Sequence, residues 1–153
     1  MGSSRKWLPP YNTQKPENET LKMAYEIKWL DRGAHRRFWG HVTAAEFLQA
    51  ITDVQKHPDY DDFKFTVSNF LDVGSYDISR TDVMTFVAHG LGARCFNSDI
   101  VVAIVATAEP TLNLVKSLYE PLSKYQIGYW PNDGEANEWV FQKTGIHPAL
   151  LGN

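Results

Sequence analysis

Two acid–serine pairs lie close together in one short stretch of the chain, "NFLDVGSYDIS", which covers residues 69–79. Asp72 and Ser75 follow an alternating, strand-like pattern, and Asp77 and Ser79 stand where the next helix should begin. A serine acts as a nucleophile only with a base to take its proton and donors to hold the oxyanion. The sequence offers no such base or third partner for these residues, so this stretch does not predict catalysis.

Two other interpretations of the same stretch stay open. In the first, Ser79 and Asp82 form an S-x-x-D helix cap, a variant of the capping box, and Gly74 opens the turn before it. In the second, Ser79 is a phosphoacceptor, with Ser75 as the nearby alternative. The helix dipole tolerates a phosphate at a helix N-terminus, and the added charge can repel or recruit a partner.

The other reactive residues form no recognisable site. No two histidines have metal-ligand spacing with a third ligand nearby, and Cys95 has no base or oxyanion donor close to it in sequence. The glycines of "GLG" at residues 90–92 follow a helix, whereas a phosphate-binding loop places them between a strand and a helix. The histidines are His35, His41, His57, His89 and His147. We therefore predict a non-enzymatic protein without a cofactor or a metal ion.

Aromatic residues make up 13% of the sequence, and four of the tryptophans lie in or beside expected elements. These four are Trp29, Trp39, Trp130 and Trp139. Most should pack in the core or cover the ends of elements, and a few could line an apolar ligand cavity.

The hydrophobic pattern changes between the strand period and the helix period along most of the chain. Strands are predicted at residues 25–30, 34–40, 62–72, 99–108 and 125–130, and a helix follows each of them from the second onward. The clearest helix begins with a capping box of Thr43 and Glu46 and ends before Pro58. Gly33 should supply the turn of a hairpin between the first two strands.

This order of elements predicts an α/β fold. The strand at residues 99–108 is apolar on both faces, which is typical of a central parallel strand with helices above and below it. Right-handed crossovers through the helices make the later strands parallel. We therefore predict a mixed sheet of about five strands with about four helices, in which only the N-terminal hairpin is antiparallel.

Length and composition narrow the class of protein. The 153 residues suit one domain, and a net charge of −3 argues against a nucleic-acid surface. No apolar run is long enough for a membrane span, and the N-terminus lacks the apolar segment of a signal peptide. The single cysteine fits a reducing compartment, so we predict a cytoplasmic protein. We expect a flexible extension at 1–22, a domain at 23–145 and a C-terminal tail at 146–153.

Four segments, in this order and spacing, resemble the SpoIIAA-like family, a bacterial branch of STAS-type domains. They are "FWGHVTAAEF", "HPDYDDFKFTVSNFLDV", "VVAIVA" and "ANEWV". The similarity covers about three quarters of the chain, from Tyr25 to Val140. It implies a STAS-like fold and a precedent that is not enzymatic.

The resemblance also implies a position for a regulatory site. Related anti-sigma-factor antagonists bind an anti-sigma kinase and are switched by phosphorylation of a serine at the start of the helix after the third strand. That position is Ser79 here, with Ser75 nearby. The antagonists carry an acid followed directly by a Ser/Thr pair and a glycine, whereas "YDISRTDV" places Ile78 after the acid and has no glycine. The family is also described beside Sec14-type lipid-binding domains, which implies a ligand carrier as an alternative.

The leading hypothesis from the sequence is therefore a protein-interaction module controlled by phosphorylation. Its partner surface is predicted to include Asp72, Tyr76, Asp77, Arg80 and Asp82, together with the outer face of the following helix. The alternative is a carrier or sensor of a small, lipid-like apolar ligand in a pocket between sheet and helices. An exposed hairpin edge could also support a homodimer.

Overall fold

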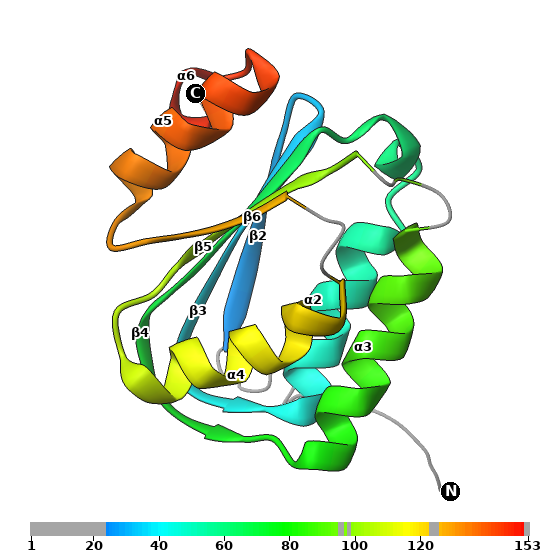
Figure 1. Cartoon of the computed structure of the whole chain (residues 1–153), viewed down its shortest axis with the longest axis vertical. Coiled ribbons are helices and arrows are strands. Elements are labelled where there is room, and N and C mark those ends of the chain that lie inside the picture. The colour runs from blue at the N-terminus through cyan, green and yellow to red at the C-terminus, as the bar shows by residue number, and fades with distance from the viewer. Residues whose placement is uncertain (1–23, 95–96, 98, 123–125, 152–153) are drawn as a thin grey trace, which may run out of the picture.

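The computed structural model describes residues 24–94, 97, 99–122 and 126–151. These residues form three layers, in which a twisted sheet lies between helices on both of its faces (Figure 1).

The sheet has five strands in the order β2-β3-β4-β5-β6, and only its first pair is antiparallel. The strands are β2 (Tyr25–Leu30), β3 (Gly33–Thr43), β4 (Phe65–Asp77), β5 (Val101–Val105) and β6 (Gln126–Trp130). The helices are α2 (Ala44–Gln55), α3 (Arg80–Arg94), α4 (Glu109–Tyr119), α5 (Asp133–Thr144) and α6 (Pro148–Leu151), with 3-10 turns η1 (Tyr60–Asp62) and η2 (Glu120–Leu122). The predicted mixed α/β sheet is confirmed.

A hydrophobic core lies on each face of the sheet. The larger core packs beneath α2, α3 and α4, where the rings of Phe38 and Phe70 stack with their centroids 4.7 Å apart. The smaller core packs beneath α5 and includes Val67 and Val140. All five residues of β5 are buried, because this strand has a core on each side. The prediction of a central strand covered on both faces is therefore confirmed.

The capping box at the start of α2 forms as predicted. The Thr43 hydroxyl accepts from the Glu46 backbone N–H at 3.2 Å, and the Glu46 carboxylate accepts from the Thr43 N–H at 3.0 Å. The second oxygen of Glu46 accepts from the Ala24 N–H at 3.2 Å. One acidic side chain therefore both begins α2 and holds the chain at the start of β2.

The β2–β3 hairpin forms, but Gly33 is not the residue with the left-handed backbone. Arg32 takes that conformation with a φ of 58°, and Gly33 is the first residue of β3. Gly33 instead lies against the ring of Phe65, where an added Cβ would be 2.4 Å from the ring carbons. The glycine is therefore required for space against its neighbour on β4 and not for turn geometry.

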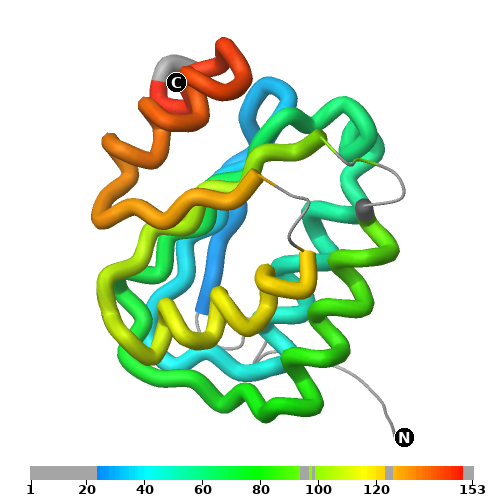
Figure 2. Tube along the Cα trace, viewed as in Figure 1, coloured from blue at the N-terminus to red at the C-terminus, as the bar shows by residue number. Residues whose placement is uncertain are grey.

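The predicted end of the third strand at Asp72 is wrong, because β4 continues to Asp77. Its pairing with β5 stops at Asn69↔Val105, whereas its pairing with β3 continues to Thr43↔Asp77 through two register shifts. Residues 39–43 and 72–77 therefore form a two-stranded ribbon that extends beyond the five-stranded sheet. Figure 2 shows this ribbon curving past the ends of the helices. Gly74 lies inside the strand and does not open a turn.

The chain continues past α5 without leaving the domain surface. Gly145, with a left-handed φ of 80°, ends α5, and Ile146 is buried in the smaller core. The predicted boundary between domain and tail at residue 145 stays a prediction. The predicted extension at 1–22 lies outside the described residues.

Two glycine substitutions test the packing of this fold. We expect Gly33→Ala to lower the free energy of unfolding by about 1–3 kcal/mol, because the new methyl group must displace the Phe65 ring. Gly92→Ala is the matched control, because its Cβ would meet nothing within 4 Å and it lies in a helix. We expect this control to be stabilised by up to about 1 kcal/mol. Urea unfolding measures both, and equal stability of the two variants would contradict the close contact at Gly33.

Candidate functional site

The ribbon divides the predicted partner surface between two faces. Successive side chains of a strand point in opposite directions. Here a register shift interrupts this alternation, because Gly74 is an extra residue between the pairs Gly40↔Val73 and His41↔Ser75. Val73 and Tyr76 consequently face the same side, and both pack against the larger core. Asp72, Ser75 and Asp77 point to the opposite face, and all three are exposed. The sequence alone predicts a turn here, which would put all of these residues on one surface.

Asp72 is held by the neighbouring strand. Its carboxylate accepts from Arg37 Nη2 at 2.8 Å, and the Arg37 guanidinium lies 5.0 Å from the centre of the Trp39 ring. Both charged side chains are largely exposed, so this ion pair contributes at most about 1 kcal/mol to stability. Asp72 therefore belongs to a mixed charged and aromatic strip on the outer face of β3 and β4.

Ser75 also has a partner that sequence reasoning missed. His41 Nδ1 lies 2.7 Å from the Ser75 hydroxyl, because the two residues are paired across the ribbon. Among the described residues, no hydrogen bond links the other ring nitrogen of His41 to a carboxylate. The pair therefore lacks the third group of a catalytic triad. Only the pairing register of the ribbon, which the sequence did not provide, could have revealed this contact.

Ser79 and Asp82 form the predicted helix cap. The Ser79 hydroxyl accepts from the Asp82 backbone N–H at 3.1 Å, and the Asp82 carboxylate accepts from the Ser79 N–H at 2.8 Å. Ser79 is exposed, as is Arg80, the first residue of α3. These two hydrogen bonds are those of a helix cap. Phosphorylation of Ser79 or Ser75 stays a prediction. A phosphate on Ser79 would lie beside the Asp82 carboxylate, and the two negatively charged groups would repel each other.

An apolar groove runs from the ribbon along the space between α3 and α4. One hollow of about 560 Å³ is bounded by the end of β4, the start of α3 and the start of α4. A second hollow of about 460 Å³ continues along α3 and shares Val83 and Ser117 with the first. We call the two hollows together the docking groove. Its apolar lining consists of Val73, Ile78, Val83, Met84, Val87, Leu114 and Pro121, among other residues.

Tyr76 forms part of the docking groove near its contact with α4. Its hydroxyl lies 2.7 Å from the Thr111 hydroxyl, which joins β4 to the first turn of α4. Burial raises the pKa of Tyr76 above its ordinary value, so the phenol stays neutral under physiological conditions. Tyr76 was predicted as a partner-surface residue, and the structure places it in the lining of the groove, where it is half-buried.

A polar cluster lies on the opposite face of the sheet, where α5 begins. His35 Nε2 lies 3.2 Å from one Asp133 carboxylate oxygen, and Asn69 Nδ2 donates to the other at 3.0 Å. The hydrogen bond with His35 lowers the pKa of Asp133 despite the opposing effect of burial. Asp133 is also the first residue of α5, where the helix dipole favours a negative charge. The cluster joins β3, β4 and α5, which are distant in sequence.

The described residues contain no group of three or more His, Cys, Asp or Glu arranged to hold a metal ion. Within the same part of the chain, no helix has the length and apolar character needed to cross a bilayer.

Structure comparison shows that the chain has a SpoIIAA-like fold. The unphosphorylated anti-sigma factor antagonist SpoIIAA superposes with a TM-score of 0.51 at 13% identity, over 76% of this chain and 97% of that protein. An uncharacterised DUF3478-family protein from Shewanella loihica, described as having a SpoIIAA-like fold, gives a TM-score of 0.52 at 12% identity. That match covers 76% of this chain and 92% of the other. No family model and no curated protein sequence matches the chain.

The Asp133 cluster predicts a specific dependence of stability on pH. Because the folded-state pKa of Asp133 is lowered, its stabilising contribution is present above the unfolded pKa of about 4 and is lost as pH falls through the folded value. We expect Asp133→Asn to be less stable than the parent at pH 7, by up to about 1 kcal/mol because the side chain is partly exposed. Urea unfolding at a series of pH values should show the difference disappear under acid conditions. A difference that is the same at neutral and acid pH would contradict this account.

Proposed function

We propose that this protein is a non-enzymatic regulatory module that binds a protein partner in the docking groove. The single observation that carries the proposal is the exposed apolar lining of that groove. Met84 is 67% exposed, which makes it the most exposed large hydrophobic residue in the described part of the chain. Contiguous exposed apolar surface on a small protein commonly marks an interaction site.

The shape of the groove indicates the kind of segment that would bind. Beyond Asn69, β4 has no β5 neighbour, so one edge of the ribbon borders the groove. A partner segment with apolar side chains could place them between α3 and α4, over Val83 and Met84. The exposed residues Arg80 and Ser117 would then supply the polar rim.

We further propose that phosphorylation of Ser79 controls this binding, with Ser75 as the alternative phosphoacceptor. Ser79 directly precedes Arg80, which lines the groove. A phosphate adds about two negative charges at pH 7. Placed beside Asp77 and Asp82, these charges would make one end of the groove strongly acidic and would exclude an acidic or apolar partner segment. The SpoIIAA structure provides a precedent, because it is of an anti-sigma factor antagonist described in its unphosphorylated form.

The predictions of a cytoplasmic location and of a homodimer remain part of this proposal. β2 forms one edge of the sheet, so its outer backbone groups border the place where a second copy could pair.

A second candidate function is the binding of a small ligand between the sheet and the helices. A cavity of about 60 Å³ lies there, lined by side chains of α2, β3, β4, α3, β5 and α4. A dry protein cavity of about 150 Å³ accepts benzene. The cavity therefore suits a ligand of a few heavy atoms. It is too small for the acyl chain of a lipid, so the alternative of a lipid-like ligand is restricted to a small molecule.

Substitution of Met84 tests the docking groove. We expect Met84→Asp to weaken binding of the physiological partner at least tenfold, because a charge would be buried in an apolar contact. Phe141→Asp is the matched control, because Phe141 is 45% exposed on α5, away from the groove. The partner is first captured from the native host and identified, and its affinity for each purified variant is then titrated. An equal loss in both variants, or no loss in Met84→Asp, would contradict docking in the groove.

The switch is tested separately by phosphopeptide mapping and by substitution of Ser79. We expect phosphate on Ser79 in protein from the native host, and we expect Ser79→Asp to bind the partner at least tenfold more weakly than the parent. Ser79→Ala should keep the partner while losing about 1 kcal/mol of stability through the lost cap. Unmodified Ser79 and Ser75, together with equal affinities of all three forms, would rule out the switch and leave the docking proposal standing.

A further inference from the structure

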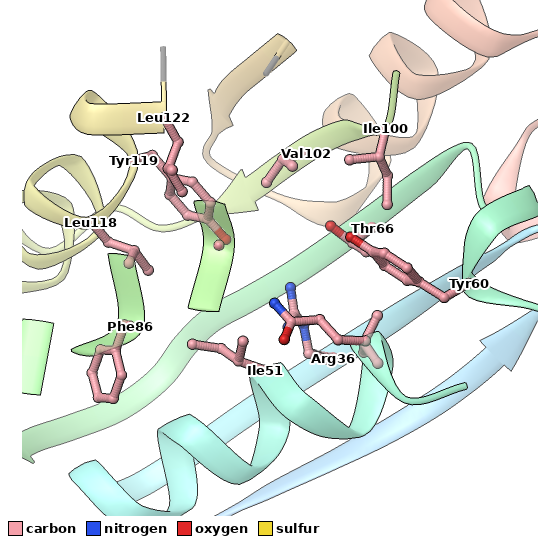
Figure 3. A pocket seen from close by; sticks show the side chains of 13 residues that line it. Arg36, Ile51, Tyr60, Thr66, Phe86, Ile100, Val102, Leu118, Tyr119 and Leu122 are labelled. Carbon is pink, nitrogen blue, oxygen red and sulfur yellow. The ribbon is translucent and has the colours of Figure 1, made fainter. Parts of the chain in front are cut away.

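The side chain of Arg36 places a positive charge inside the larger core. Arg36 lies in the middle of β3 and is 7% exposed. Its guanidinium points into the cavity between the sheet and the helices (Figure 3). Arginine remains protonated in proteins, so this charge cannot be removed by loss of a proton.

The protein satisfies the hydrogen-bonding groups of Arg36 only in part. Nε donates to the Ser68 hydroxyl at 3.1 Å, and Nη1 reaches the Ala50 carbonyl on α2 at a long 3.4 Å. Both acceptors are neutral. Within the described residues, no carboxylate forms an ion pair with Arg36. A buried cation without a counter-charge costs several kcal/mol, so the site favours an anion that can approach the guanidinium.

Most of the other lining residues are apolar, and the polar ones are the uncharged Gln55, Tyr60, Thr66 and Tyr119. Ile51, Phe86, Val102 and Leu118 surround the space into which Arg36 reaches (Figure 3). None of the lining residues that the structure describes has an acidic side chain. The Arg36 guanidinium and the apolar side chains around it therefore suit a molecule that has one planar anionic group and a short apolar portion.

An open hollow at the protein surface adjoins the cavity. The cavity shares Gln55 and Tyr60 with an outer hollow of about 530 Å³ between α2, η1 and α3. These two side chains separate the buried space from the open one. Movement of the Gln55 side chain, whose amide donates to the His89 carbonyl at 3.4 Å, would connect them.

We propose that this cavity binds a short-chain carboxylate, with its anionic group on Arg36 and its hydrocarbon portion against the apolar wall. The volume of about 60 Å³ is less than half of the roughly 150 Å³ that accepts the six carbons of benzene, so it restricts the ligand to about the size of formate or acetate. Inorganic oxyanions share the charge but cannot use the apolar wall. This proposal rests on the second candidate function above and is independent of the docking groove.

The test is a titration of the full chain with formate, acetate, butyrate and hexanoate, monitored by amide NMR shifts and by thermal unfolding. Ionic strength is held constant with chloride. We expect affinity to rise about fourfold from formate to acetate, as the burial of roughly 0.8 kcal/mol per added carbon implies. Affinity should fall for butyrate and hexanoate, which exceed the cavity. Nitrate and phosphate should bind more weakly than acetate.

Two controls separate the role of the charge from the role of the cavity. Acetamide has nearly the same shape as acetate without the charge, and we expect it to bind at least tenfold more weakly. Arg36→Met keeps the length of the side chain, and we expect it to fold, because an apolar replacement of a buried charge is commonly tolerated. This variant should lose the preference for acetate over acetamide, whereas Arg36→Lys should keep it in weakened form.

Each alternative result is decisive. Equal binding of acetate and acetamide, or unchanged acetate binding by Arg36→Met, would overturn the anion site while keeping a small-ligand cavity. Stronger binding of inorganic oxyanions than of acetate would overturn the carboxylate assignment. No response to any ligand would overturn both this proposal and the second candidate function, without affecting partner docking.

Discussion

The parallel pairing of β3 with β4 is the interaction on which the rest of the structure depends. It runs from Gly33↔Phe65 to Thr43↔Asp77 and joins the hairpin to the parallel part of the sheet. At its beginning it places the Phe65 ring over Gly33, and at its end it brings the caps of α2 and α3 close together. The start of α2 and the start of α3, which lines the docking groove, are therefore set by this one pair of strands.

The length of that pairing also explains why the ribbon differs from the rest of the sheet. β5 ends opposite Asn69, so β4 loses one neighbour while it keeps the other. The two register shifts allow the ribbon to bend past the helices without losing its pairing with β3. The polar residues Asp72, Ser75 and Asp77 are consequently exposed on one face, while Val73 and Tyr76 contribute to the core and the groove. Strand geometry, and not a turn, distributes the candidate residues.

The same strand carries a second unusual constraint. Phe38 and Arg36 both point toward the larger core, two residues apart on β3. Phe38 stacks on Phe70 and completes the packing, whereas Arg36 brings a charge that no side chain among the described residues neutralises. A chain that needed only stability would gain from an apolar residue at this position. The retained charge is the physical reason for assigning a binding role to the cavity.

Much of the fold could be predicted because its signals are local. Several predicted features depend only on residues that are close in sequence, and the structure confirms them. They are the capping boxes of Thr43 and Ser79, the apolar run of β5 and the order of strands and helices. The end of β4 could not be predicted, because Gly74 and Ser75 are common in turns and only the facing residues of β3 keep them extended. The His41–Ser75 contact and the His35–Asp133 cluster depend on register and on long-range packing, which no local pattern encodes.

The central claim is that a partner occupies the docking groove beside Ser79. Amide hydrogen exchange along the whole chain, measured with and without the purified partner, tests it most directly. We expect slower exchange in residues 72–87 and at the start of α4, with little change in α5. Protection confined to α5, with unchanged exchange along the ribbon and α3, would contradict it.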